Sequence, residues 1–166
     1  MSDYFPGEIT IGGRIPRRLL DELAERIASE GVSIDWQQAL YAPAIREAIE
    51  AAAATGRTVR FTDDEAICGR FEDLEDWLTS RGIDFDRHND ARFEHDGENV
   101  YVRDRKCPMS VNSDQSGNDL VPVAEVREIL ASQSPPNEKL VRITRLAAAP
   151  PTLTPITLTD DERRKP

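Results

Sequence analysis

The chain has 166 residues, of which 39% are hydrophobic and 31% are charged, and its net charge at pH 7 is −10. This mixture is typical of a solvated globular protein and argues against an intrinsically disordered chain. No stretch approaches the ~18–20 consecutive apolar residues that a membrane span needs, and residues 1–7 lack the basic and apolar regions of a secretory signal. We therefore expect a cytoplasmic protein that does not contact a membrane.

The first half of the chain alternates between strand and helix patterns. Segments rich in β-branched residues with a period of two predict strands, and apolar residues spaced by three and four predict helices. The predicted strands are residues 8–11, 32–36 and 57–62, and the predicted helices are residues 16–29 and 43–54. Pro16 suits the first turn of a helix, and Gly31 suits the position just after a helix ends.

The middle of the chain contains one more helix and a predicted hairpin. The predicted elements are a helix over residues 70–80, a strand over residues 83–87 and a hairpin that turns at residues 96–97. The helix places Trp77 on its apolar face. The dipeptide Asp-Gly is typical of a two-residue hairpin turn, and it would pair Phe93 with Val100 and Ala91 with Val102.

The pattern becomes weaker toward the C-terminus. We expect a helix over residues 123–131 and one more short helix over residues 139–148. Residues 149–166 are rich in Pro, Thr and charged residues and contain little to bury, so we expect them to form a disordered tail. The sequence thus predicts one α+β domain over residues 1–148, followed by that tail.

The order of the elements predicts an α+β fold. We expect a mainly antiparallel sheet of about four to six strands with helices packed on one face. The clean alternation within the strands favours a sheet with one solvated face, because strands buried on both faces would be continuously apolar. A ferredoxin-like or related split-βαβ layout is our expectation for the topology.

Negative charge is concentrated in the middle of the chain. Residues 63–98 hold 13 acids and 4 bases, whereas residues 1–62 hold 9 and 7, and residues 99–166 hold 9 and 10. A field of this sign repels phosphate backbones and attracts basic protein surfaces, so we expect a basic protein partner and no direct nucleic-acid binding. The candidate partner-binding residues are Glu72, Asp73, Glu75, Asp76, Asp84 and Asp86. The alternative is that these acids only keep the protein soluble.

A second candidate site is the turn after the first predicted strand. Two glycines between a strand and a helix start can expose backbone amides to an anion, and nearby arginines add positive potential. The residues of this candidate anion site are Gly12, Gly13, Arg14, Arg17 and Arg18. No phosphate-binding fingerprint accompanies them, so a simple strand-to-helix turn is the alternative.

Patterns typical of catalysis or metal binding are weak. Cys68 and Cys107 form no CxxC motif, and we expect free thiols in a reducing cytosol. His88 follows Asp84 and Asp86 on a predicted strand, but their spacing does not match a calcium-binding loop, so we expect a solvated strand face. We therefore expect no catalytic residue, no metal and no cofactor, although an enzyme stays open as the less favoured class.

The run from Gly69 to Leu78 resembles small bacterial proteins, and this resemblance implies no activity. Our hypothesis is a small, acidic, non-enzymatic interaction or adaptor protein of bacterial type, which docks a basic partner through the acidic surface of residues 63–98. The alternative is a small anion-binding domain or enzyme that uses the Gly12-Gly13-Arg14 turn. The oligomeric state stays open.

Overall fold

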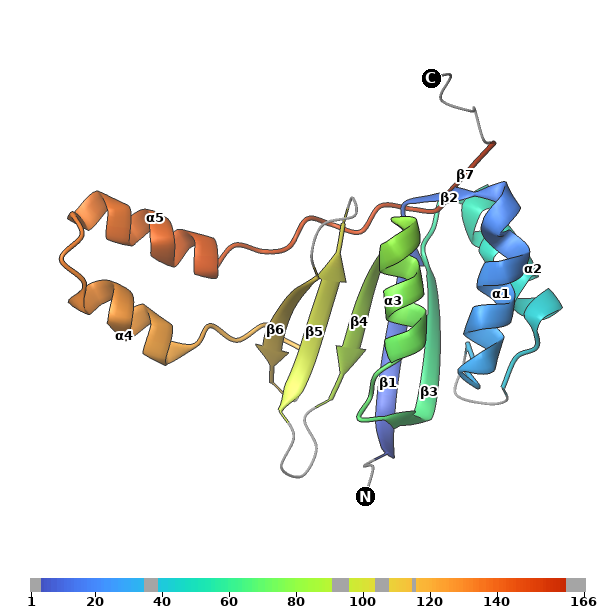
Figure 1. The fold of residues 1–166 in the computed structure, drawn as a ribbon, viewed down its shortest axis with the longest axis horizontal. Helices are drawn as coiled ribbons and strands as arrows, with labels where there is room; N and C mark the ends of the chain where they lie inside the picture. Colours follow the sequence, from blue (N-terminus) through green and yellow to red (C-terminus); the bar gives the residue numbers. More distant parts are fainter. Residues whose placement is uncertain (1–3, 35–38, 91–95, 104–107, 115, 161–166) are drawn as a thin grey trace.

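The computed structural model describes residues 4–34, 39–90, 96–103, 108–114 and 116–160 (Figure 1). It confirms the predicted α+β class, with five α-helices and a five-stranded antiparallel sheet in this part of the chain. In chain order the elements are β1 (Tyr4–Gly12), β2 (Arg14–Pro16), the 3₁₀ turn η1 (Arg17–Leu19), α1 (Leu20–Ser29), α2 (Ala42–Ala54), β3 (Val59–Ile67), α3 (Glu72–Arg81), β4 (Asp84–Asn89), β5 (Gly97–Val102), β6 (Met109–Ser113), α4 (Val123–Ala131), α5 (Pro136–Leu146) and β7 (Thr157–Thr159).

The strand order of the main sheet is β3-β1-β4-β5-β6. β1 pairs antiparallel with both β3 and β4, so β3 and β4 run parallel to each other on either side of it. α3 connects these two strands, which makes β3-α3-β4 the split-βαβ layout that the order of elements predicted. A second, two-stranded sheet joins β2 and β7 in parallel.

The core lies against one face of the main sheet. On β1 the side chains of Phe5, Ile9 and Ile11 are buried, whereas Glu8 and Thr10 between them stay partly exposed on the other face. α1, α2 and α3 all contribute to the same core, as predicted for helices on one face of a half-solvated sheet. Their buried residues include Leu23, Ile27, Ile45, Ile49, Leu74, Trp77 and Leu78.

Most predicted elements are present, with shifted ends. α3 ends at Gly82, whose φ of 68° lies in the left-handed region that favours glycine at this position. Of the predicted strand over residues 32–36, Ser33 forms a single bridge with Thr62 on β3, and residues 35 and 36 lie outside the described part of the chain.

The predicted hairpin register is wrong. Val100 pairs with Arg87 and Val102 pairs with Phe85, because β4 and β5 are the strands that form the hairpin. Register follows the apolar pattern of the buried face, and the fully buried Phe85 opposite Val102 satisfies that pattern. Phe93 and Ala91, the partners that the turn signal predicted, lie outside the described residues.

The segment that follows α5 corrects the expectation that disorder begins at residue 149. Ile156 is 2% exposed and belongs to the hydrophobic core, and β7 directly after it pairs with β2. The Gly13 amide donates to the Thr154 carbonyl oxygen at 2.9 Å. A Cβ at Gly12 would lie 2.3 Å from that same oxygen, so glycine is required where the segment crosses β1. Residues 161–166 of the predicted tail lie outside the described residues.

Between β6 and this returning segment, α4 and α5 form a helical hairpin that stands away from the sheet (Figure 1). We call residues 123–146 the arm. Ile129 is the one buried residue of α4, and α5 has none. The arm is therefore held by its two connections and by the contact between its own helices.

Candidate functional site

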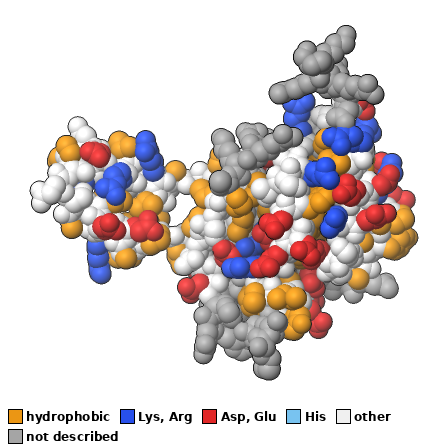
Figure 2. Space-filling model, viewed as in Figure 1, with side chains coloured by type: hydrophobic (Ala, Val, Ile, Leu, Met, Phe, Trp, Pro, Cys, Tyr) orange, Lys and Arg blue, Asp and Glu red, His pale blue; other side chains and the backbone are white. Residues whose placement is uncertain are grey.

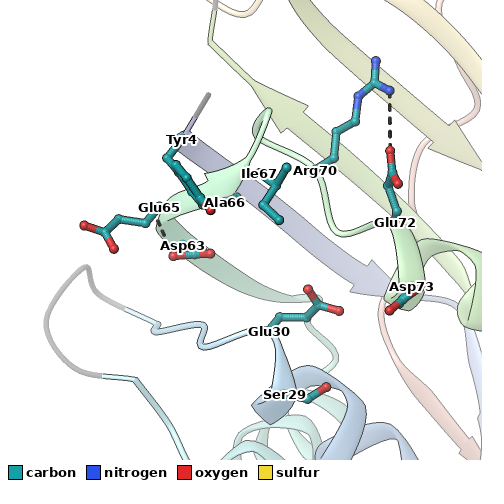
Figure 3. Close-up of a pocket in the computed structure, with 10 residues that line it drawn as sticks. All are labelled: Tyr4, Ser29, Glu30, Asp63, Glu65, Ala66, Ile67, Arg70, Glu72 and Asp73. Atoms are coloured by element: carbon teal, nitrogen blue, oxygen red, sulfur yellow. Dashed lines mark hydrogen bonds and ion pairs between the residues drawn. The ribbon is translucent and has the colours of Figure 1, made fainter. Parts of the chain in front are cut away.

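A hollow of about 420 Å³ lies between the end of α1, the end of β3 and the start of α3 (Figure 3). We call it the acidic hollow, because its lining carries five carboxyl groups and one guanidinium. The residues that line it are Tyr4, Ser29, Glu30, Asp63, Glu65, Ala66, Ile67, Arg70, Glu72 and Asp73.

Local structure explains why these acids meet. α1 ends at Ser29, so Glu30 projects from the end of the helix, where the unpaired carbonyl groups add partial negative charge. α3 begins at Glu72, and acids in the first turn of a helix are stabilised by its positive end. Asp63 and Glu65 lie on β3, which reaches the same end of the molecule.

Glu30 lies where burial and several like charges act on the same carboxyl group. Burial raises the pKa of Glu30, and the nearby charges of Asp73, Asp63 and Glu75 raise it further. Figure 3 shows the Glu30 carboxylate between Asp63 and Asp73. Arg70 lies on the rim of the hollow, but Glu72 and Glu98 already pair with its guanidinium, at 3.9 Å and 3.3 Å respectively. The hollow therefore keeps an excess of negative charge.

The hollow also has an apolar component. Tyr4 is 59% exposed and Ile67 is 56% exposed, although both are large and hydrophobic. Exposed apolar side chains beside carboxylates suit a lysine or arginine, because such a side chain packs its alkyl stem on an apolar surface and keeps its charged group near acids.

The structure brings together only part of the acidic surface that the sequence predicted. Glu72 and Asp73 line the hollow, and Asp76 is exposed on α3. Glu75 is committed within the protein, because its Oε1 accepts the Phe71 amide at 3.1 Å and pairs with Arg87 at 3.2 Å.

Asp84 and Asp86, the remaining predicted acids, lie on the opposite face of the sheet. Residues on β4 alternate, and Phe85 between these two aspartates is the one that faces the core. Asp86 forms an ion pair with Arg103 at 2.6 Å, and burial raises its pKa even though Arg103 lowers it. The acids of residues 63–98 are therefore divided between two faces.

Three acids of the hollow were not named among the predicted partner-binding residues. Asp63 and Glu65 lie within the predicted acidic surface of residues 63–98, although they were not singled out. Glu30 lies outside that run, and only the way α1 and β3 pack places it in the hollow.

The glycine turn is already occupied by the chain itself. The Gly13 amide is bonded to Thr154, and the Gly13 carbonyl accepts the Thr157 amide at 2.8 Å. Arg17 pairs with Asp160 at 3.1 Å, and Arg14 is exposed. The returning C-terminal segment thus occupies the space beside Gly12 and the backbone groups of Gly13 that an anion would need. Arg18 is exposed.

A buried cation lies between α3 and the sheet. Arg87 is 3% exposed, and its guanidinium contacts Glu75, Asn89 and, at 2.6 Å, Glu98. Burial raises the pKa of Glu98, but the hydrogen bonds from Ser110 and Arg87 outweigh this effect and bring the pKa below its ordinary value. Because every charge in this cluster is paired within the protein, we assign it a structural role.

The solvated face of the sheet carries a second polar network. Tyr101 donates to Asp119 at 2.8 Å, Asn99 donates to Asp119 at 2.7 Å, and His88 lies within hydrogen-bond distance of Asn99 and Asp90. Burial and the hydrogen bond to Asp119 raise the pKa of Tyr101. The polar side chains of this network are hydrogen-bonded to one another.

The described residues form no metal-binding cluster. Within them, no group of three or more His, Cys, Asp or Glu side chains is arranged to hold a metal ion. Cys68 is a free, partly exposed thiol, and Cys107 lies outside the described residues. No helix in the described part of the chain combines the length and apolarity of a membrane span.

Comparison with known proteins adds no family. The chain matches no protein-family model, and no significant match is found among curated proteins or solved structures. What the structure defines is an α+β protein built on one split-βαβ unit, with an acidic hollow at one end of its helical layer and a two-helix arm beyond β6.

Proposed function

We propose that this protein is a non-enzymatic interaction protein that docks a basic partner in the acidic hollow. The observation that carries the proposal is the concave group of five acids whose one arginine, Arg70, is already paired with Glu72 and Glu98. Burial is the main cause of the raised pKa of Glu30, and repulsion from Asp73, Asp63 and Glu75 adds to it. A partner cation placed there relieves this repulsion.

The geometry suits an arginine or lysine side chain better than a small-molecule substrate. The lining of the hollow contains no histidine or cysteine, and its one serine, Ser29, donates its hydroxyl to the Arg26 carbonyl oxygen at 2.6 Å rather than to a base. A partner side chain could form charge-assisted hydrogen bonds with Asp63 and Asp73 while its stem packs on Tyr4 and Ile67.

The proposal predicts that binding depends on the hollow rather than on net charge. An arginine-rich peptide is titrated calorimetrically into wild type and into two variants with the same charge change, Glu65→Lys/Asp73→Lys in the hollow and Glu25→Lys/Glu47→Lys on α1 and α2. We expect the hollow variant to bind at least ~10-fold more weakly and the control to bind nearly as wild type does, since close opposite charges dominate such contacts. Wild-type binding should weaken with salt as the Debye length falls from about 10 Å at 0.1 M to about 3 Å at 1 M.

Equal weakening in the two variants would show that the peptide responds only to the overall field, and it would overturn the assignment to the hollow. Circular dichroism and thermal melting of each variant confirm that it is folded. All four positions are exposed and lie outside the core, so we expect both variants to fold.

The raised pKa of Glu30 predicts how peptide binding and stability depend on pH. Because its pKa is raised in the folded protein, lowering the pH protonates Glu30 before an ordinary glutamate, and the affinity for the basic peptide should fall over that interval. Its ionised form also opposes folding at neutral pH, and this cost disappears as the pH falls through the folded-state pKa. Glu30→Gln should therefore be slightly more stable than wild type at pH 7 and should lose this part of the pH dependence of binding. An unchanged binding profile would mean that Glu30 does not face the ligand.

A further inference from the structure

The arm is the part of the described chain with the most unpartnered surface. Its helices and the segment leading into them expose large apolar side chains, which are 37–64% accessible. These side chains are Leu120, Val121, Val123, Leu130, Leu140 and Val141. In Figure 2 the arm forms a separate lobe with hydrophobic, basic and acidic side chains on its surface.

α5 in particular lacks the packing that ordinarily holds a short helix. It has 11 residues and none is buried. Isolated helices shorter than about 12–15 residues are marginal in water, and protein helices gain most of their stability from packing one face. A surface that covers α5 would therefore stabilise the helix as well as bury its apolar side chains.

The exposed face of α5 combines apolar and basic groups. Val141, Arg142 and Arg145 are spaced so that they share one face, and all three are exposed. The helix holds one acid and three bases. Arg142 and Arg145 line the cleft between α4 and α5 together with Glu125 and Glu128, and both stay exposed at its edge. A surface that offers further carboxylates next to apolar side chains would suit the exposed side of this helix.

The acidic hollow is such a surface, and it lies at the other side of the molecule. The arm follows β6, which is one edge strand of the sheet, whereas the hollow is lined by β3, the opposite edge strand. Three strands spaced by about 4.8 Å separate these edges, and both ends of the arm are tied to the body, so an arm does not reach the hollow of its own chain.

We propose that α5 of one copy of this protein docks in the acidic hollow of a second copy. Arg142 and Arg145 then face the acids of the partner's hollow, and Val141 packs on its exposed apolar side chains. This inference rests on the proposed function, since it names the basic partner as the same chain. Each copy carries one arm and one hollow, so two copies that exchange arms satisfy both contacts in a closed pair.

The test is sedimentation velocity of the full chain over a range of concentrations, at low and high salt. We expect wild type to self-associate at low salt and to dissociate at high salt. The arm variant Arg142→Glu/Arg145→Glu and the hollow variant Glu65→Lys/Asp73→Lys should each associate at least ~10-fold more weakly. Arg26→Glu/Arg57→Glu is the matched control, because it reverses two exposed arginines on the body, and it should associate as wild type does.

The decisive sample is an equimolar mixture of the arm variant and the hollow variant. In a mixed pair one contact joins a wild-type arm to a wild-type hollow, and the other joins a negative arm to a positive hollow. The mixture should therefore regain the association that each variant lost alone.

Three results would overturn the inference. They are a wild type that stays monomeric at every concentration, an association that neither variant weakens, and a mixture that stays dissociated. If the wild type is monomeric but still binds the arginine-rich peptide in the hollow, self-docking fails and the proposed function stands. If it is monomeric and binds no peptide, both fail.

Discussion

The arm and the segment that follows it make opposite use of secondary structure. α5 is a regular helix of 11 residues without a single buried side chain. The chain from residue 152 to 160 has only three residues of strand, yet it buries Ile156 to 2% exposure and covers the glycine turn. A segment with regular hydrogen bonding therefore need not contribute to the core, and an irregular segment can contribute to it.

The irregular segment succeeds because its polar backbone groups are satisfied one by one. The Ile156 amide donates to the Arg57 carbonyl at 3.0 Å, and the Thr157 amide donates to Gly13. Pro155 restricts the backbone to an extended form before folding, which lowers the entropy lost on docking. These contacts replace the hydrogen bonds that a longer strand would supply.

The largest expected effect belongs to Ile156. Replacing it with alanine leaves a cavity in the core, and we expect a loss of about 2–5 kcal/mol in the free energy of unfolding, as for other buried large-to-small changes. Urea denaturation of wild type and Ile156→Ala measures this loss.

Gly12→Ala disturbs the same contact from the side of β1. The added Cβ would crowd the Thr154 carbonyl oxygen, and we expect the free energy of unfolding to fall by about 1–3 kcal/mol. If both variants unfold like wild type, the segment does not belong to the core and the comparison with the arm collapses.

The smallest expected effect belongs to the arm. Leu140 is 64% exposed, so Leu140→Ala should change the free energy of unfolding of the isolated chain by no more than about 0.5 kcal/mol. The same urea experiment at low protein concentration measures it. A destabilisation comparable to that of Ile156→Ala would mean that the arm packs on the body, and the distinction between the two regions would be lost.

Local pattern was enough to predict the elements that have strong periodicity. α3 was placed to within about two residues, since Trp77 and Leu78 follow Leu74 at helical spacing and Gly82 supplies a left-handed end. The hairpin register was not predicted, because the Asp96-Gly97 turn signal is local whereas register is decided by which residues face the core. Ile156 was missed because the alternating run Ile156-Thr157-Leu158-Thr159 is only four residues long and follows a segment rich in proline and threonine.

The acids that line the hollow were predicted only in part. Counting charge along the chain found the region of Glu72 and Asp73, since they follow one another on α3. The same count also included Asp84 and Asp86, which alternation on β4 turns to the other face of the sheet. Glu30 comes from a distant helix end, and no pattern in the sequence places it beside Asp73.

The pairing of β7 with β2 also has a consequence during synthesis. The partners Arg14 and Thr157 lie near opposite ends of the described chain. A ribosome adds roughly 5–20 residues per second, and N-terminal elements emerge first. Until residues 156–159 have left the ribosome, the site in the core that Ile156 fills is open to water. The core of the nascent chain is therefore incomplete during this time. The arm is made during this interval, so its exposed helices and the unfilled core are available to chaperones at the same time.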